Sequence, residues 1–169
     1  MKKHLSLVLC IGILAVTAAP SWAAVTASKK LPDGEQFTVE GGTLRIQFWS
    51  PEIVRVTYAA AGELPLLKSL SVVASPAAVR LTRQQDNQAF TLVAPDFKVR
   101  IDKQTGAVGF FDLAGHLLLR EAAQGRKIEP AAVAGAAVTS CTQSFELSPD
   151  EGIYGLGQHQ RDVWNYLTG

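Results

Sequence analysis

Apolar and polar residues alternate along much of the chain from residue 36 onward, and no window there has the period of an amphipathic helix. Because successive side chains of a strand point to opposite faces, this period of two predicts strands with one buried face. Arg45, Thr57, Lys98 and Arg100 occupy outward positions and are expected to be more exposed. The predicted inward set is Leu44, Ile46, Phe48, Val54, Val56, Tyr58, Phe97, Val99 and Ile101.

Turn-forming residues separate these strands about every eight to twelve residues, a spacing typical of antiparallel sandwiches. Gly41-Gly42 suits the positive φ angles of a tight hairpin, and Ser50 to Glu52 form a turn signal. Gly106 and Gly115 mark two further turns. The predicted fold class is therefore all-β: one antiparallel β-sandwich over residues 36–147.

Other segments of the chain follow less regular patterns. Strands are predicted at 69–74 and 78–83, on either side of Ser75-Pro76, whereas 122–140 is rich in small residues and has no clear period. That segment fits a loop, an insertion or a poorly packed edge strand. A strand resumes over 138–147. Residues 148–151 resemble one helical turn, with a serine N-cap followed by proline.

The first 23 residues have the features of a secretory signal peptide. A short basic start precedes an apolar run from Leu5 to Ala19, and Ser21 and Ala23 stand three and one positions before the expected cut. The apolar run is shorter than the roughly 20 residues of a membrane span. We expect an exported protein, periplasmic or extracellular, with no membrane segment after signal removal and a leader at residues 24–35.

Charge and cysteine content narrow the function classes. Loss of Lys2 and Lys3 with the signal leaves 14 basic and 15 acidic residues, so no basic field attracts nucleic acid. Cys141 is then the one remaining cysteine, which leaves no internal disulfide. We expect its thiol to be buried and unreactive, because no histidine or lysine lies near it in sequence. A mature chain of this size is about one domain, and a (β/α)8 barrel needs about 250 residues.

Candidate chemical groups are few. His116 and His159 have no metal-ligand spacing with each other or with Cys141, so no metal is predicted. Acids such as Asp102 and Asp112 lie at strand ends, where carboxylates usually form turns; Asp96 is similar. The run "GLGQHQ" lacks the third glycine of a dinucleotide fingerprint, so no cofactor is predicted.

Three segments resemble glycoside hydrolase family 31, the retaining α-glucosidases and α-xylosidases. "LRIQFWSPEIVRVTY" is similar to a strand pair of that family, and "DFKVRIDKQTGAVGFFDLAGHLLLRE" to a second run. The end of the chain, "EGIYGLGQHQRDVWNYLTG", is similar to a third. Its matching residues are Tyr154, Gly155, Leu156, Gly157, Gln158, His159, Gln160, Asn165, Tyr166 and Gly169.

The resemblance implies an N-terminal sandwich of the galactose-mutarotase type, followed in the family by a (β/α)8 barrel that carries both catalytic aspartates. It therefore implies no catalytic residue in this chain, and an α-linked oligosaccharide as the ligand of the parent enzyme. Residues 148–169 would begin the seam with the barrel. Gln158 and His159 are candidates for sugar or interdomain contacts there; structural hydrogen bonding at the seam is the alternative.

Two other functions stay open. A secreted carbohydrate-binding sandwich without catalysis would use exposed aromatic side chains such as Trp49 or Trp164. An epimerase of the mutarotase type would need a histidine and a carboxylate in one concave site, with His116 or His159 as the histidine. We also expect residues beyond Ser148 to be poorly fixed, because they carry several large apolar groups that need a covering partner.

Overall fold

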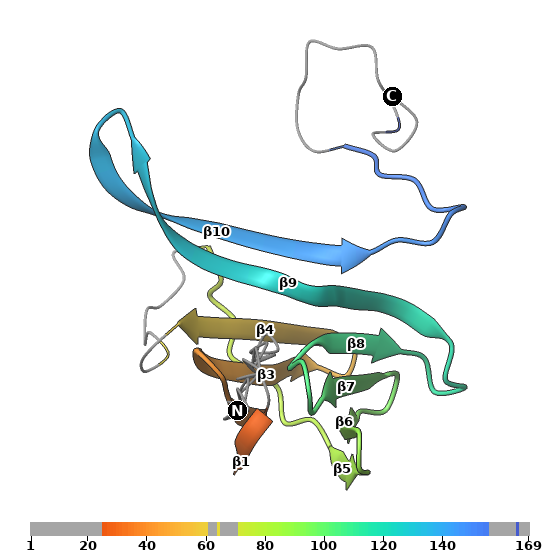
Figure 1. Cartoon of the computed structure of the whole chain (residues 1–169). Coiled ribbons are helices and arrows are strands. Elements are labelled where there is room, and N and C mark those ends of the chain that lie inside the picture. Colours follow the sequence, from red (N-terminus) through yellow and green to blue (C-terminus); the bar gives the residue numbers. More distant parts are fainter. Residues whose placement is uncertain (1–24, 61–63, 65–70, 156–164, 166–169) are drawn as a thin grey trace, which may run out of the picture.

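The computed structural model describes residues 25–60, 64, 71–155 and 165, and these form ten strands in two antiparallel sheets (Figure 1). No helix in this described part is long and apolar enough to cross a membrane. The four-stranded sheet has the order β1 (Val25–Leu31), β2 (Gly34–Val39), β3 (Gly42–Ser50), β4 (Ile53–Ala60). The six-stranded sheet runs from β10 to β5: β10 (Ala136–Glu146), β9 (Leu117–Val133), β8 (Val108–Phe111), β7 (Lys98–Asp102), β6 (Ala89–Val93), β5 (Thr82–Gln85).

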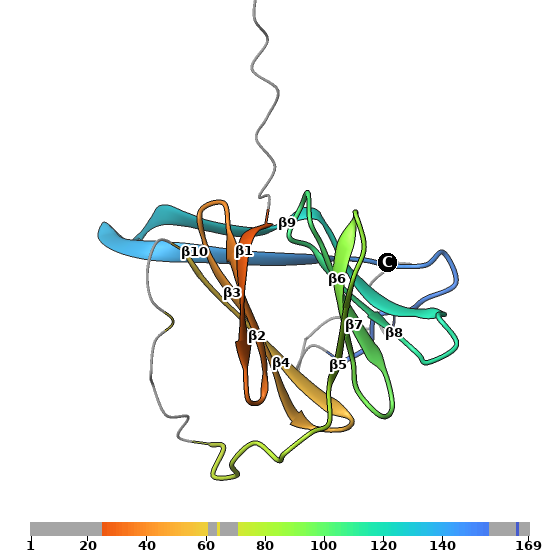
Figure 2. The same ribbon diagram turned by 90° about the horizontal axis from the view of Figure 1, so that it is seen from below.

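The two sheets form the two layers of a sandwich, with the long β9–β10 hairpin lying across one end (Figure 2). The core lies between the layers. Its fully buried side chains come equally from both sheets: Phe37, Leu44, Ile46, Phe48, Leu92, Val99, Ile101 and Val108. The predicted all-β antiparallel sandwich is confirmed.

The predicted inward set faces this core. Five of its nine members are fully buried, and Val54, Val56, Tyr58 and Phe97 are half-buried against the cluster. The first three belong to β4, which is the edge of its sheet and so has a neighbouring strand on one side only. The four outward positions are half-buried, and so they are more exposed than the five fully buried members of the inward set.

The predicted turns are present, with one shift. The β2–β3 hairpin turns at Glu40-Gly41, not Gly41-Gly42, because Val39 pairs with Gly42. Gly41 takes the positive φ of 80° that the turn requires. Gly42 is needed for another reason: a Cβ there would stand 2.1 Å from the carbonyl oxygen of Ala59 on β4.

The sandwich begins earlier than the sequence predicts. β1 lies inside the expected leader at 24–35, yet it pairs with β2 along its length, and Val25 donates a backbone hydrogen bond to Lys103 of the other layer at 2.9 Å. Most of its side chains are exposed. An edge strand held mainly by main-chain hydrogen bonds has no apolar alternation, which is why the pattern missed it.

Two local predictions are wrong, and for residues 122–140 the alternative of a poorly packed edge strand is the correct one. Residues 71–81 contain no strand, and β5 begins only at Thr82; Pro76 has no N–H to donate to a ladder. Most of 122–140 belongs to β9 and β10, which turn at Ala134-Gly135 with both φ angles positive. Residues 148–151 form a turn closed by the backbone hydrogen bond from Glu151 to Ser148, 3.0 Å, and no helix.

A pair of isoleucines tests the position of the core. Ile46 on β3 is fully buried, whereas Ile53 at the start of β4 is 59% exposed. We expect Ile46→Ala to lower the free energy of unfolding by about 2–5 kcal/mol and Ile53→Ala by about 0.5 kcal/mol or less, measured by urea denaturation. Equal losses would contradict this placement of the core.

Candidate functional site

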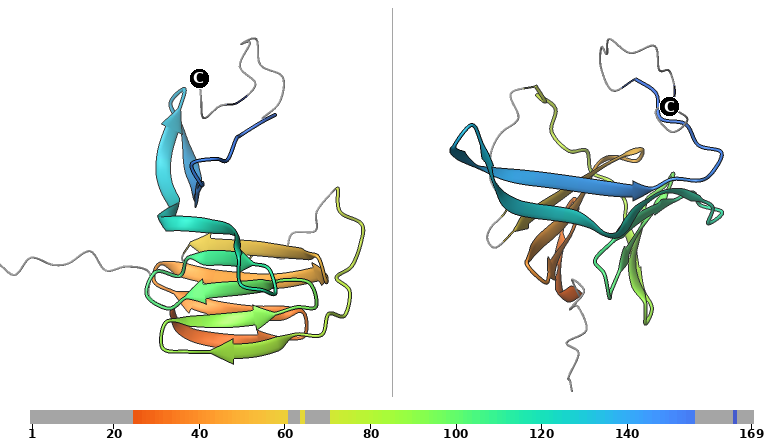
Figure 3. Two further views of the ribbon diagram at one scale, coloured as in Figure 1. Left: turned by 90° about the vertical axis from the view of Figure 1, so that its right-hand side faces the viewer. Right: turned by 45° about the horizontal axis from the view of Figure 1, so that its top comes forward.

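The β9–β10 hairpin is the most exposed part of the described chain. It rises from the end of the sandwich next to β4 and β8 (Figure 3). Every residue of β10 is exposed, as is every residue of β9 from Lys127 onward. Apolar side chains share this exposure, including Val133 at 64% and Phe145 at 43%. A long hairpin with open apolar side chains is the kind of surface that usually contacts a partner.

A bulge directs the hairpin away from the sandwich. Gln124 has a φ of 56°, and the register between β9 and β10 shifts between Gln143 and Phe145. Such an irregularity bends a strand and increases its twist. The first part of β9 therefore pairs with β8, and the remainder leaves the sheet with β10 alone.

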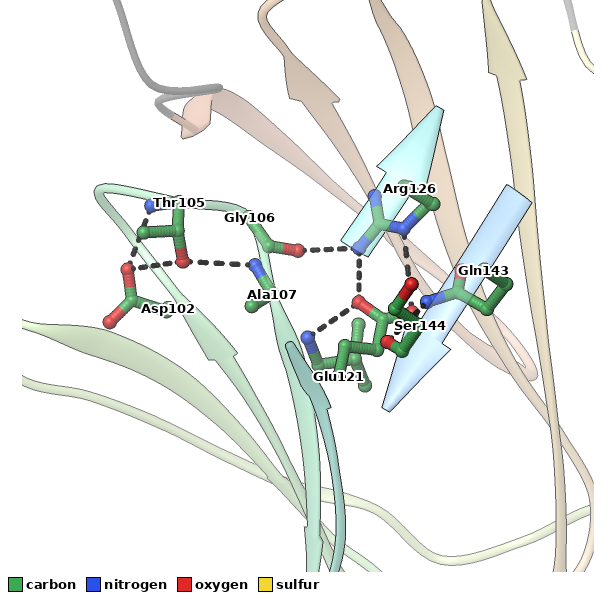
Figure 4. A network of polar contacts seen from close by, with 9 residues as sticks. Asp102, Thr105, Gly106, Ala107, Glu121, Arg126, Gln143 and Ser144 are labelled. Carbon is green, nitrogen blue, oxygen red and sulfur yellow. Dashed lines mark hydrogen bonds and ion pairs between the residues drawn. The ribbon is translucent and has the colours of Figure 1, made fainter. Parts of the chain in front are cut away.

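A buried ion pair fixes this bend. Glu121 is only 5% exposed, and its carboxylate forms a short ion pair with Arg126 (Figure 4). The same carboxylate accepts the backbone N–H of Val108 at 2.9 Å, and Arg126 donates to the carbonyl of Gly106 at 2.8 Å. The guanidinium also lies 5.2 Å from the ring centroid of Tyr58 on β4. These contacts of Glu121 and Arg126 thus join the bend of β9 to β8, to the turn that precedes β8 and, through Tyr58, to the opposite sheet.

A concave apolar surface lies beneath the hairpin. This cavity of about 400 Å³ is formed by β4, β8, β9 and β10. Cys141 also lines it and is exposed, so the predicted buried thiol is wrong. Apolar and aromatic side chains form most of its wall: Val56, Tyr58, Phe110, Leu119, Ile128 and Phe145. We call this surface the hairpin cavity.

The acids at strand ends form turns, as predicted. Asp102 accepts the backbone N–H groups of Gln104 and Thr105, and Asp112 accepts those of Gly115 and His116. Within the described residues, no three His, Cys, Asp or Glu side chains are grouped to hold a metal ion.

His116 is bonded to a turn and lies on the surface. Its Nδ1 is 2.7 Å from the carboxylate of Asp112, and its side chain is 80% exposed. This hydrogen bond is the main cause that lowers the pKa of Asp112 below its usual 3.8. Neither residue lines the hairpin cavity. The exposed position of His116 on a turn therefore gives no support to an epimerase site at this histidine.

Of the four sequence candidates for sugar contact, Trp49 lies within the described residues. Trp49 is half-buried, and its indole Nε1 is buried with no acceptor in the described part of the chain, so its ring is no open platform for sugar. Outside the described residues lie Gln158, His159 and Trp164. Most of the residues beyond Ser148, which are expected to be poorly fixed, lie outside them as well. Glu121 and Arg126 were not predicted as site residues.

The comparisons with known proteins agree with one another. Residues 43–163 match the glycosyl hydrolase 31 N-terminal galactose mutarotase-like domain. Alpha-glucosidase 2 of Bacillus thermoamyloliquefaciens is 29% identical over 89 residues, which are 53% of this chain and 11% of that protein. The GH31 alpha-xylosidase of Xanthomonas citri is similar in structure, with a TM-score of 0.67 and 28% identity over 78% of this chain and 15% of its own.

A GH31 alpha-xylosidase from a soil metagenome supports the fold alone. Its TM-score is 0.64 at 23% identity, over 83% of this chain and 23% of its own. The chain spans between 11% and 23% of the length of these three relatives.

The ion pair at the bend yields a stability prediction. Arg126→Met leaves the buried Glu121 carboxylate without its cation, so we expect a loss of about 3 kcal/mol in the free energy of unfolding. The matched control is Lys127→Met, which removes an exposed charge from the next residue and should change it by about 0.5 kcal/mol or less. Urea denaturation measures both. A loss no greater in Arg126→Met than in Lys127→Met would contradict the conclusion that the Glu121–Arg126 ion pair fixes the bend.

The Asp112–His116 contact yields a pH prediction. We expect His116→Ala to raise the pKa of Asp112 toward 3.8, measured by NMR titration of the carboxyl carbon. Asp86, whose pKa is lowered chiefly by the backbone N–H groups of Gln88 and Ala89, should not change. Because the folded pKa of Asp112 is depressed, its stabilising effect is present above the unfolded pKa and lost as pH falls through the folded pKa. An unshifted Asp112 in the variant would show that the ring makes no such contact.

Proposed function

The chain belongs to the family of glycosyl hydrolase 31 N-terminal galactose mutarotase-like domains, and from that premise we propose that it is the carbohydrate-associated N-terminal domain of an exported α-glycosidase. The observation that carries the proposal is the family match, which extends over most of the described sandwich. The parent enzyme would be a retaining exo-acting enzyme with an α-linked oligosaccharide as substrate.

The chemistry of retention supports a catalytic site elsewhere. A retaining glycosidase places two carboxyl groups about 5–5.5 Å apart across one glycosidic bond. In the described sandwich, the carboxylates of Asp102 and Asp112 accept turn hydrogen bonds, and that of Glu121 is buried in an ion pair. A carboxylate committed in this way is poorly placed to attack or protonate a sugar. We therefore propose that the domain supports a catalytic domain and has no hydrolytic activity of its own.

The hairpin cavity is our candidate for the surface that meets the catalytic domain. It is apolar, it is adjacent to an exposed hairpin, and β9 is anchored at the bend by buried bonds. Burial of such a surface is favourable at about 25 cal/mol per Å². We extend the seam to residues 148–169, where Gln158 and His159 stay proposed contacts with sugar or with the catalytic domain.

The relatives and two segments of the sequence bear on the substrate and the location of the parent enzyme. The relatives include an alpha-glucosidase and two alpha-xylosidases by name. The Gln158-His159-Gln160 run favours an α-xylosidase type. The features of residues 1–23 support export to the periplasm or the extracellular space.

An activity assay tests the proposal. We expect the purified chain to release no p-nitrophenol from p-nitrophenyl α-xyloside or α-glucoside above a heat-denatured control, because it would lack the paired carboxylates. A known α-xylosidase assayed in parallel shows that the substrates are competent. Turnover that co-purifies with the chain and is lost on denaturation would refute a purely supporting role.

A further inference from the structure

A row of polar residues crosses the outer face of the six-stranded sheet. Arg100 on β7 pairs with Gly109 on β8, Gly109 pairs with Arg120 on β9, and Arg120 pairs with Glu146 on β10. The flanking Val99, Ile101 and Val108 are buried in the core. Since alternate residues point to opposite faces, the row lies on the face turned away from the core.

At the centre of the row, an aromatic ring takes the place of a side chain from Gly109. Gly109 contributes no side chain between the two arginines, and a Cβ at this position would stand 2.9 Å from the ring of Phe111. The half-buried Phe111 ring therefore lies over the glycine, on the floor of a groove of about 250 Å³. We call this the outer-face groove, and its main lining residues are Arg100, Asp102, Gly109, Phe111, Arg120 and Glu146.

The two arginines are only loosely engaged by the protein. Arg100 contacts Gln88 at 3.5 Å and Asp86 at 3.6 Å, and Arg120 contacts Glu146 at 3.4 Å. Ordinary N–H···O hydrogen bonds are about 2.9 Å long. Within the described residues, these contacts use one nitrogen of each guanidinium, whereas a guanidinium has five N–H donors. Most of their capacity is available to a ligand in the groove.

The charges of the groove point to a neutral ligand. Two arginines face two carboxylates, Asp102 and Glu146, and the third carboxylate of the lining, Glu121, is already paired with Arg126. A balanced set offers both donors and acceptors, which suits the hydroxyl groups of a sugar better than a phosphate or a carboxylate. An aromatic ring on the floor suits the apolar C–H face of a pyranose.

We propose that the outer-face groove binds one pyranose ring of a neutral oligosaccharide. Phe111 supports the ring, and Arg100 and Arg120 donate to its hydroxyl groups. Glu146 accepts from them, as does the Oδ2 of Asp102, since the turn hydrogen bonds of that carboxylate go to its Oδ1. The volume is just below the range of roughly 300–1,000 Å³ typical of whole small-molecule sites, which fits one ring better than a longer segment. The class of sugar in this inference rests on the proposed function. The groove itself does not, because all of its lining residues belong to this chain.

NMR titration of the chain tests the groove. The probes are methyl α-D-xylopyranoside, methyl α-D-glucopyranoside and D-glucuronate. We expect saturable shifts at Gly109 and Phe111 with a neutral glycoside, and at least tenfold weaker binding in Arg100→Gln and in Arg120→Gln. The control Arg55→Gln removes an exposed arginine from β4 in the other sheet and should bind like the parent chain.

Three results would overturn the proposal. They are no saturable shift with either neutral glycoside at millimolar concentration, undiminished binding in both groove variants, or tighter binding of glucuronate than of the neutral probes. Both substituted arginines are at least two-fifths exposed, so we expect the variants to fold, and dispersed amide spectra would check this. The p-nitrophenol assay has a separate readout, so failure of the groove and failure of the proposed function are distinguishable.

Discussion

Burial of the Glu121 carboxylate is the constraint on which the outer part of the structure depends. A buried carboxylate must be hydrogen-bonded and paired with a cation, or the desolvation cost is several kcal/mol. Here Val108 and Arg126 supply those partners. The guanidinium of Arg126 can reach the carboxylate only because β9 bulges at Gln124. The bulge, the direction of the hairpin and the shape of the hairpin cavity are therefore consequences of one local requirement.

A similar pair closes another part of the sandwich. Glu35 and Glu121 are the two buried charged residues of the described chain, and each faces an arginine. Arg83 of β5 donates to the carbonyls of Leu31 and Gly34 at 2.9 Å, which ties the six-stranded sheet to the β1–β2 turn of the other layer. The apolar core between the layers is non-directional, whereas these arginines set how the layers meet at two of their borders.

Alternation in the sequence predicts a strand that buries one face, and it cannot predict a strand that buries neither. Alternation located Leu44, Ile46 and Phe48 because β3 is flanked by strands and covered by the other sheet. The same reasoning could not find β1 or the outer half of the hairpin, since an exposed strand has no apolar stripe. It also predicted a buried Cys141 for a strand that is exposed throughout.

The candidate sites were less predictable than the fold. Glu121 and Arg126 are five residues apart, a spacing that puts side chains on opposite faces of a regular strand, so only the bulge brings them together. The outer-face groove depends on the register of four strands, which no local pattern specifies. The turn roles of Asp102 and Asp112 were predictable because their hydrogen bonds are local in sequence.

A double-mutant cycle on Glu121→Gln and Arg126→Met tests the central constraint most directly. The free energy of unfolding of the parent chain, both single variants and the double variant is measured in urea. Because the two side chains stabilise each other, the double variant should lose less than the sum of the single losses, with a coupling of about 1–3 kcal/mol. Losses that add to within about 0.5 kcal/mol would show that the pair does not hold the bend.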